Sequence, residues 1–536
     1  MNTFKRKSLY AALAGVSALG VTGAAEAVFV NPDGLGQVLL YPYYTVRETG
    51  GSAYNTLLSV VNSTGSVKGV KVRFMEGKNS RETLDFNLYL SPYDVWTAAV
   101  IPTADGAAVK TTDTSCTSPA QLLAAGQPFV NYAYSGFNPG PQWDGSPQDL
   151  DRGREGYFEI IEMGVITHAT AAAWATHAQS YARGAMAPTV PLATAVAMNC
   201  GAIAAQDAGA GMGVYMVPPT GGLFGGETIV NVMQGTDYTA DPVALDAFST
   251  AVLWNNPGTI YPNLANVTPK TSTTFGNVAG SPLLVQTTWG LVWNLPADPV
   301  SAVLMHDAIV NEYVVDGSAG NTAYGTDWVV TFPTKWNYYA PSLGAYWSNG
   351  DADIPVMGLF QRNYSNGACD DVSIRLWDRE ERSPVAQGGF SPPRPGELSP
   401  TLCWEANVIT FNNSNVLASV NSRNVSAPIP NYATPEGWMR LGFPLVNYSM
   451  ASSPYSGPAA HRLIGGATTY ITAGAATAST ADFATYYGLP TIGFAVNRYT
   501  FNNMPTATGT VLANYGGNFI HKGSKAITFG NIPPAP

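Results

Sequence analysis

Two neighbouring segments of this chain alternate apolar and polar residues with a period of two. In residues 67–74 the apolar side chains share one face, while Lys71 and Arg73 lie on the other. Residues 83–90 repeat the pattern. A period of two is typical of β-strands with one buried face, and the turn-forming residues between the segments predict antiparallel neighbours. We therefore expect an antiparallel β-sandwich in this part of the chain.

Similar strand-like segments recur along the whole sequence. Only 12% of the residues are charged, and glycine occurs 55 times, a composition that suits many turns and uncharged strand faces. A single core rarely grows past about 250–300 residues, so a chain of 536 residues predicts several lobes. We expect a mainly β protein of antiparallel β-sandwich lobes, immunoglobulin-like or jelly-roll-like, with long loops and a few short helices.

The lobes are expected to follow one another along the chain. Residues 28–150 predict an N-terminal β-sandwich lobe, and residues 151–340 a β-rich lobe with helical insertions. Residues 341–536 predict a C-terminal β-rich lobe, either separate from the preceding lobes or interleaved with them. The expected helices cover residues 169–183, 191–205 and 298–315. Asp298 is the expected N-cap of the last of these helices, with Pro299 in its first turn.

The first 27 residues have the pattern of a secretory signal peptide. Lys5, Arg6 and Lys7 form a charged start, residues 9–23 are small and apolar, and residues 25–27 read Ala-Glu-Ala. The apolar stretch is too short, and too rich in glycine and alanine, for a stable membrane span. We expect export to the cell surface, the medium or the periplasm, and no transmembrane span once the signal is removed.

The four cysteines predict disulfides, because disulfides are the default for an even number of cysteines in an exported chain. Four cysteines allow three connectivities. Their order along the chain favours Cys116 with Cys200 and Cys369 with Cys403.

The charge pattern indicates which classes of binding partner to expect. The formal net charge is −10, and no dense cluster of lysine and arginine follows residue 7. Binding to nucleic acid or to an anionic membrane surface depends on concentrated basic charge. We therefore expect neither partner, and regard cell-surface glycans and other envelope proteins as candidates. The oligomeric state stays open.

One segment suggests a metal ion. Asn349, Asp351 and Asp353 place oxygen ligands at alternate positions, as loops that bind Ca²⁺ often do. The alternative is a solvated turn, since the glycine and bidentate glutamate of an EF-hand are missing. We expect no other cofactor.

Two groups of side chains suggest contact with sugars. Trp336, Tyr338 and Tyr339 form the densest aromatic cluster and are candidate ligand-binding residues, although a packed strand end is the plainer interpretation. Glycoside hydrolysis needs two carboxylates about 5–9 Å apart. The candidate pairs are Glu159 with Glu162, which a regular strand directs to opposite faces, and Asp378 with Glu380, beside two arginines.

Motifs for acyl transfer are missing from the sequence. The mature chain has no G-x-S-x-G turn. The five histidines have no metal-binding spacing. A Ser/His/Asp set assembled from distant segments stays an alternative, because such triads are defined by geometry. We assign no catalytic residue.

Residues 54–62, 327–335 and 488–494 resemble segments of uncharacterised exported or surface proteins of proteobacteria. The resemblance implies export and surface display, and carries over no functional residue. The first functional hypothesis is an exported, noncatalytic protein with a structural, adhesive or ligand-binding role. The alternative is a secreted glycan-active hydrolase with paired carboxylates in a Trp-lined groove.

Overall fold

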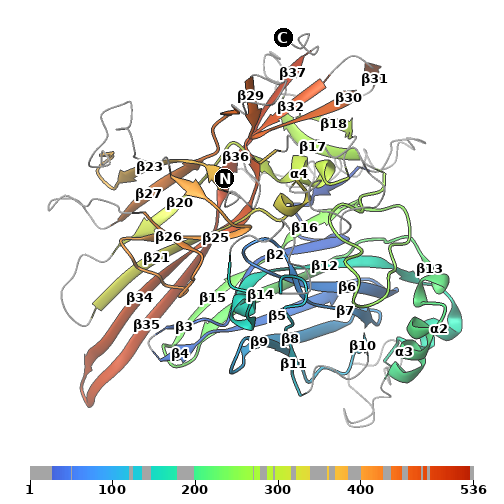
Figure 1. Ribbon diagram of the computed structural model, residues 1–536, viewed down its shortest axis with the longest axis horizontal. Helices are drawn as coiled ribbons and strands as arrows, with labels where there is room; N and C mark the ends of the chain where they lie inside the picture. The colour runs from blue at the N-terminus through green and yellow to red at the C-terminus, as the bar shows by residue number, and fades with distance from the viewer. Residues whose placement is uncertain are drawn as a thin grey trace, which may run out of the picture.

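The computed structural model describes residues 27–49, 51–119, 125–135, 146–177, 198–269, 271–277, 286–293, 296–315, 322–338, 359–360, 369–383, 400–425, 436–448, 457–472, 475–479 and 483–530. The protein is mainly β, with several antiparallel sheets and few short helices (Figure 1). The predicted fold class is confirmed.

Two large sheets form a first sandwich. The eight-stranded sheet runs in the order β1 (Phe29–Val30), β16 (Val243–Asp246), β2 (Val38–Thr45), β12 (Glu155–Ile166), β6 (Val67–Glu76), β7 (Glu82–Leu90) and β10 (Cys116–Ser118), with β13 (Met216–Val217) paired to β12. The six-stranded sheet runs β11 (Gln127–Pro128), β9 (Ala107–Lys110), β8 (Val95–Pro102), β5 (Asn55–Asn62), β14 (Leu223–Asn231) and β15 (Thr236–Ala240). Inward-facing side chains of both sheets, such as Val72 and Trp96, share one core.

The outer face of the eight-stranded sheet is buried as well, which corrects the expectation that Lys71 and Arg73 face solvent. All ten residues of β6 are buried. The segment after β16 covers this face, where the Asn256 carbonyl accepts a hydrogen bond of 3.0 Å from Lys71 Nζ. Lys71 is also paired with Asp85 at 2.5 Å, and Arg73 with Glu82 at 2.8 Å.

The first sandwich continues past residue 150, where a lobe boundary was expected. Strand β12, which follows that boundary, lies between β2 and β6, and it is the strand with the most extensive pairing to β6. Strands β14, β15 and β16 then add to both sheets. The first sandwich therefore extends from β1 to β16, and the link at residue 150 is the 3-10 helix η1 (Leu150–Arg154) that leads directly into β12.

The second half of the chain builds three further main sheets. The first contains β17 (Thr271–Asn277), β18 (Gln286–Val292), β30 (Arg462–Thr472), β32 (Phe483–Tyr487) and β37 (Ala526–Gly530), with β31 (Ala475–Ser479) paired to β30. The second contains β23 (Ser373–Asp378), β27 (Glu436–Gly442), β20 (Ala308–Val314) and β36 (Lys522–Ser524). The third contains β26 (Ser422–Val425), β25 (Ala406–Phe411), β21 (Thr322–Thr331), β34 (Ile492–Thr506) and β35 (Gly509–Ile520).

Strands from both sides of residue 340 build the same sheets. Strand β21 pairs with β34, and β20 pairs with β27. The second and third of these sheets share one core, in which Tyr313 of β20 stacks on Phe411 of β25 with ring centroids 5.1 Å apart. The described residues also form four small two-stranded sheets: β3 (Glu48–Thr49) with β4 (Ser52–Ala53), β19 (Met305–His306) with β33 (Leu489–Pro490), β22 (Asp370–Asp371) with β24 (Thr401–Leu402), and β28 (Val446–Tyr448) with β29 (Gly457–Ala460).

The helix expected over residues 298–315 ends early. Helix α4 covers Asp298–Leu304, and the chain then enters β19 and β20. Ile309, Val310 and Tyr313 favour a strand, where β-branched and aromatic side chains pack well. The N-cap is Ala297 and not Asp298, which lies in the first turn. Besides α4 and η1, the described residues form the helices α2 (Ala169–Trp174), α3 (Cys200–Ala208), η3 (Met212–Tyr215) and η4 (Lys335–Tyr338).

The two halves pack on each other through shared cores. One core joins Tyr54 and Tyr157 of the first sandwich to Val408 and Phe494 of the third sheet of the second half. The Tyr54 hydroxyl donates a hydrogen bond of 2.7 Å to the Val416 carbonyl. This junction fixes the position of the second half against the first sandwich (Figure 1).

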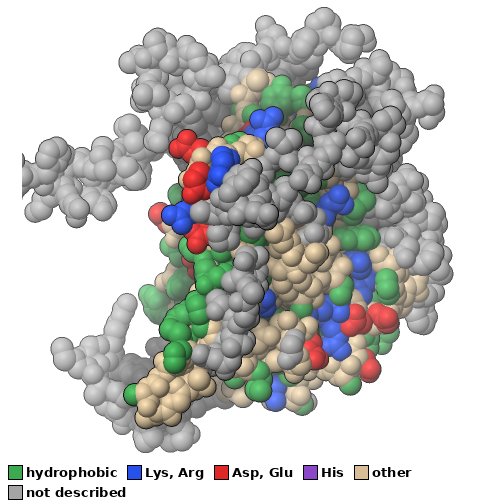
Figure 2. Space-filling model, turned by 90° about the vertical axis from the view of Figure 1, so that its left-hand side faces the viewer, with side chains coloured by type: hydrophobic (Ala, Val, Ile, Leu, Met, Phe, Trp, Pro, Cys, Tyr) green, Lys and Arg blue, Asp and Glu red, His purple; other side chains and the backbone are tan. Residues whose placement is uncertain are grey.

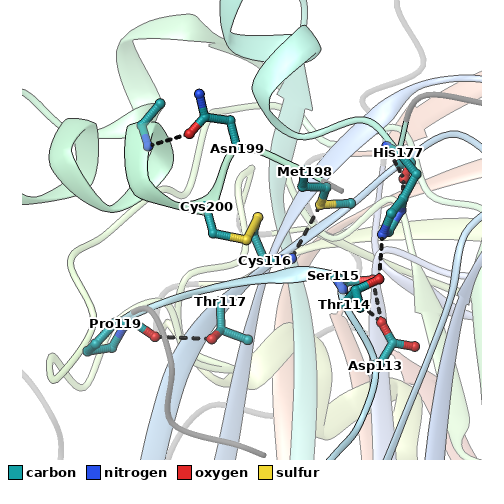
Figure 3. Close-up of a disulfide and its surroundings, with 12 residues drawn as sticks. Asp113, Thr114, Ser115, Cys116, Thr117, Pro119, His177, Met198, Asn199 and Cys200 are labelled. Carbon is teal, nitrogen blue, oxygen red and sulfur yellow. Dashed lines mark hydrogen bonds between the residues drawn. A yellow bond between two sulfur atoms is a disulfide. The ribbon is translucent and has the colours of Figure 1, made fainter. Parts of the chain in front are cut away.

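Two disulfides brace the chain, one joining Cys116 to Cys200 and the other Cys369 to Cys403. Figure 3 shows the first of them, which ties β10 to the start of α3. Asn199 caps α3 by accepting a hydrogen bond of 3.1 Å from the Ala202 N–H. Disulfides are typical of oxidising compartments. In the part of the chain that the structure describes, no helix has the length and apolar character needed to cross a membrane.

Candidate functional site

The most distinctive surface feature is a stacked pair of tryptophans. Trp377 of β23 and Trp438 of β27 lie directly opposite each other, with ring centroids 4.1 Å apart and an interplanar angle of 10°. Their strand neighbours Leu376 and Met439 are buried in the core. Since successive side chains in a strand point to opposite faces, both tryptophans project from the outer face of the sheet. Trp438 is 41% exposed and Trp377 half-buried.

Charged side chains flank this pair on the same face. Arg375 and Arg440 are paired across β23 and β27 two residues away from the tryptophans, and Glu312 of β20 is opposite Trp438. Two residues along a strand span about 6.6 Å. The neighbouring charges are therefore within reach of a ligand lying on the rings. We call Glu312, Arg375, Trp377, Trp438 and Arg440 the tryptophan surface.

Two salt bridges lie at the edge of the tryptophan surface. Arg440 is 3.2 Å from Asp307, and Arg379, in the turn after β23, is 3.2 Å from Glu436. Both arginines keep donors beyond those used in these pairs, because a guanidinium carries five N–H groups.

A second exposed apolar surface lies on the long hairpin of β34 and β35. Tyr515 and Phe519 of β35 are 56% and 47% exposed. Figure 2 shows a band of hydrophobic side chains below a group of acidic and basic side chains, with mainly polar side chains and backbone at the tip beneath the band. The other face of β35 packs on the first sandwich, where Asn514 Nδ2 donates to the Gln234 carbonyl. The band is apolar, whereas the tryptophan surface combines rings with hydrogen-bonding groups.

The predicted platform of Trp336, Tyr338 and Tyr339 is not borne out at Tyr338. This residue is buried, and its hydroxyl is 2.8 Å from both Asp298 and Ser301 of α4. Burial raises the pKa of Tyr338 well above its usual range. The plainer interpretation, a packed end of a strand, describes Tyr338, because it fills the space between η4 and α4. Trp336 is half-buried, and Tyr339 lies outside the described residues.

The calcium candidates Asn349, Asp351 and Asp353 lie outside the described residues. Within the described ranges, no group of three or more His, Cys, Asp and Glu side chains is placed to hold a metal ion. Asp151 of η1 is engaged by Arg47 at 2.6 Å and by Arg154 at 2.8 Å.

The candidate carboxylate pairs are engaged in salt bridges. Glu162 is 2.6 Å from Lys68, and Glu159 contacts Arg73. Burial raises the pKa of both glutamates, and their basic partners oppose that shift. Asp378 accepts a hydrogen bond of 2.8 Å from Arg382 in a turn. These three carboxylates therefore neutralise the charges of neighbouring basic side chains.

The structure does bring a histidine, an aspartate and two hydroxyls together beside the first disulfide. His177 Nε2 is 3.1 Å from Thr114 Oγ1, and His177 Nδ1 is 2.8 Å from Ser91 Oγ (Figure 3). Asp94 is further away, 3.6 Å from Nδ1. In a catalytic triad the carboxylate binds Nδ1 directly, but here a hydroxyl takes that position. The nearby Asp94 carboxylate raises the pKa of His177, and the group ties residue 177 to the turn before β8.

Comparisons with protein-family models, with curated proteins and with solved structures give no match. The resemblance to exported surface proteins of proteobacteria therefore stays a prediction.

The tryptophan surface was missed in the sequence, although a signal for it is present. Residues 373–378 and 436–442 both alternate, with Leu376 and Met439 in the core and a tryptophan and an arginine on the opposite face. An aromatic residue on the polar face of an alternating strand is the feature that identifies such a surface. The pairing of the two strands requires the structure.

Proposed function

We propose that this chain is an exported, noncatalytic β-sandwich protein of the cell surface or periplasm that binds a glycan through the tryptophan surface. The predicted signal peptide and the two disulfides support export. The observation that carries the proposal is the exposed stack of Trp377 on Trp438 with charged rows beside it.

The chemistry of this surface suits a saccharide. The apolar C–H face of a sugar ring packs on an indole. The hydroxyls of the sugar accept hydrogen bonds from guanidinium groups and donate hydrogen bonds to carboxylates. Tryptophan and arginine are also the residues most enriched where binding energy concentrates. Arg375, Arg440 and Glu312 supply both kinds of hydrogen-bonding group next to the rings.

The alternative of a secreted hydrolase has less support. That mechanism requires two carboxylates about 5–9 Å apart that face the substrate. Glu159 and Glu162 are buried in the first sandwich, and Asp378 is engaged in a turn with Arg382.

A glycan array tests the proposal with the secreted, disulfide-bonded protein. We expect the wild-type protein to bind a subset of glycans, and Trp438→Ala to lose those signals. Trp174→Ala is the control, since Trp174 is a half-buried tryptophan on α2 of the first half. An array on which the wild-type protein binds nothing, or on which Trp438→Ala and wild type give the same signals, would refute the proposal.

A further inference from the structure

A cavity of about 210 Å³ lies where the two halves meet. The first sandwich contributes Val30, Pro42 and residues 240–243, and the second half contributes the end of α4 and residues of β19, β20, β34 and β35. Binding sites occur preferentially at such junctions. An engineered cavity of about 150 Å³ holds benzene, so this one has room for a compact molecule of a few more heavy atoms.

The walls are mainly apolar and include Val243, Ile309, Ile492 and Phe494. Three basic side chains also line the cavity: His306, His521 and Lys525. His521 Nε2 is 2.9 Å from the Val329 carbonyl, which only accepts, so this nitrogen carries the proton.

Both histidines are neutral at physiological pH. Burial lowers the pKa of His521 to about 4 and that of His306 to about 3, with Lys525 adding to the second shift. His306 Nδ1 is buried with no hydrogen bond of good geometry within the described part of the chain.

Lys525 is the cation of the cavity. The residue as a whole is exposed, but its Nζ donates a hydrogen bond of 2.6 Å to the Val303 carbonyl in the last turn of α4. This contact caps the helix and uses one of the three ammonium donors. Among the described residues no carboxylate forms a salt bridge with Lys525, and Asp241, the acid that lines the cavity, is itself exposed.

We infer that this cavity binds a small monocarboxylate with a compact apolar body, its carboxylate on Lys525 Nζ and its body against Val243, Ile309 and Phe494. A monoanion matches the single cation, and a charge-assisted hydrogen bond is about twice as strong as a neutral one. The apolar walls exclude a purely polar anion as the best ligand. This site is separate from the tryptophan surface, so either can fail without the other.

Isothermal titration with benzoate tests the inference. We expect the wild-type protein to bind benzoate with a Kd below about 1 mM, and benzyl alcohol, which has the same body without the charge, at least about tenfold more weakly. Lys525→Gln should weaken benzoate binding by at least about tenfold. Lys110→Gln, which changes an exposed lysine of β9, should leave it unchanged.

Val243→Phe provides a second test that leaves the charge in place, because it fills the apolar part of the cavity. We expect this variant to lose benzoate binding while its melting temperature stays close to that of wild type. Three results would overturn the inference: wild type that fails to bind benzoate up to about 10 mM, equal affinity for benzoate and benzyl alcohol, or unchanged affinity in Val243→Phe. The comparison of the two ligands uses wild-type protein, so it stands even if a variant fails to fold.

Discussion

Lys68 and Glu162 form an ion pair inside the first sandwich, and both side chains are fully buried. Glu162 also accepts hydrogen bonds from the Thr220 and Gly221 N–H groups. Removing one partner of a buried pair leaves an uncompensated charge, which costs far more than removing both charges together. The pair therefore matters less for net stability than for the position of residues 220–221 against β12.

We predict that Lys68→Met lowers the free energy of unfolding by about 3–5 kcal/mol. Lys68→Met combined with Glu162→Gln should recover more than half of that loss, because the amide is neutral and keeps an acceptor for the Gly221 N–H. Urea unfolding measures both values. Lys110→Met, at an exposed lysine, should stay within about 0.5 kcal/mol of wild type. A loss below about 1 kcal/mol in Lys68→Met would show that the pair is not buried as described.

Glu227 of β14 is a buried acid of a different kind. Neither of its carboxylate oxygens has a hydrogen bond of good geometry in the described structure, and burial raises its pKa well above the usual value of 4.5. The backbone of Tyr43 opposes this shift, but burial is the larger effect. The folded state therefore favours the protonated form of Glu227 relative to the unfolded chain.

The sign of the pH dependence follows from this difference. A raised folded-state pKa gives stability that is present below the unfolded pKa and is lost as the pH rises, by up to about 1.4 kcal/mol per pH unit. We predict that Glu227→Gln removes this decline between pH 5 and 9 and makes the protein more stable than wild type at pH 8. Urea unfolding at several pH values measures the two slopes. Parallel slopes would contradict a raised pKa of Glu227 in the folded protein.

At the scale of the elements, strand β12 organises the first sandwich, because it lies between β2 and β6. At Gly156 the backbones of β12 and β6 lie too close for a side chain, since a Cβ there would overlap the Met75 carbonyl of β6. We predict that Gly156→Ala destabilises the protein by about 1–3 kcal/mol. Gly226→Ala in β14 is the control, because the nearest atom to its new Cβ would be 3.9 Å away. Thermal unfolding of the two variants tests this, and equal melting temperatures would contradict the packing around β12.

The strands and helices also show which features the sequence patterns predict and which they do not. Alternation predicted the strands of the first sandwich, because the inward face of β6 is apolar. Alternation wrongly placed Lys71 and Arg73 on a solvent-exposed face. Their burial depends on residues that follow β16, far along the chain, and on acidic residues of other strands. In residues 298–315, the strand preference of Ile309, Val310 and Tyr313 outweighed the helical spacing once β27 was available as a partner.

The molecule as a whole was harder to predict than its parts. The placement of β12 between β2 and β6, and of β21 beside β34, are pairings over long sequence distances that local patterns do not encode. The tryptophan surface also depends on the pairing of two strands that are far apart in the sequence. Each tryptophan is visible in its own strand, but their stacking depends on the antiparallel register of β23 and β27.

The two disulfides brace different halves of the molecule. They close segments with sequence separations of 84 and 34 residues. In the chain-entropy model, links of this size each contribute about 3–5 kcal/mol by restricting the unfolded chain. We predict that reduction lowers the melting temperature by several degrees, and that Cys116→Ser with Cys200→Ser reproduces part of the shift. Calorimetry with and without reductant measures it, and an unchanged melting temperature would contradict the bracing role.

The central claim is that this protein acts through the tryptophan surface. Isothermal titration of the strongest oligosaccharide from the glycan array tests it most directly. We predict that Trp438→Ala raises the Kd by at least about tenfold, as expected for a residue at the centre of a binding surface. Trp174→Ala should keep the wild-type Kd, and circular dichroism should show both variants folded. A folded Trp438→Ala protein that binds the oligosaccharide as tightly as wild type would contradict the account.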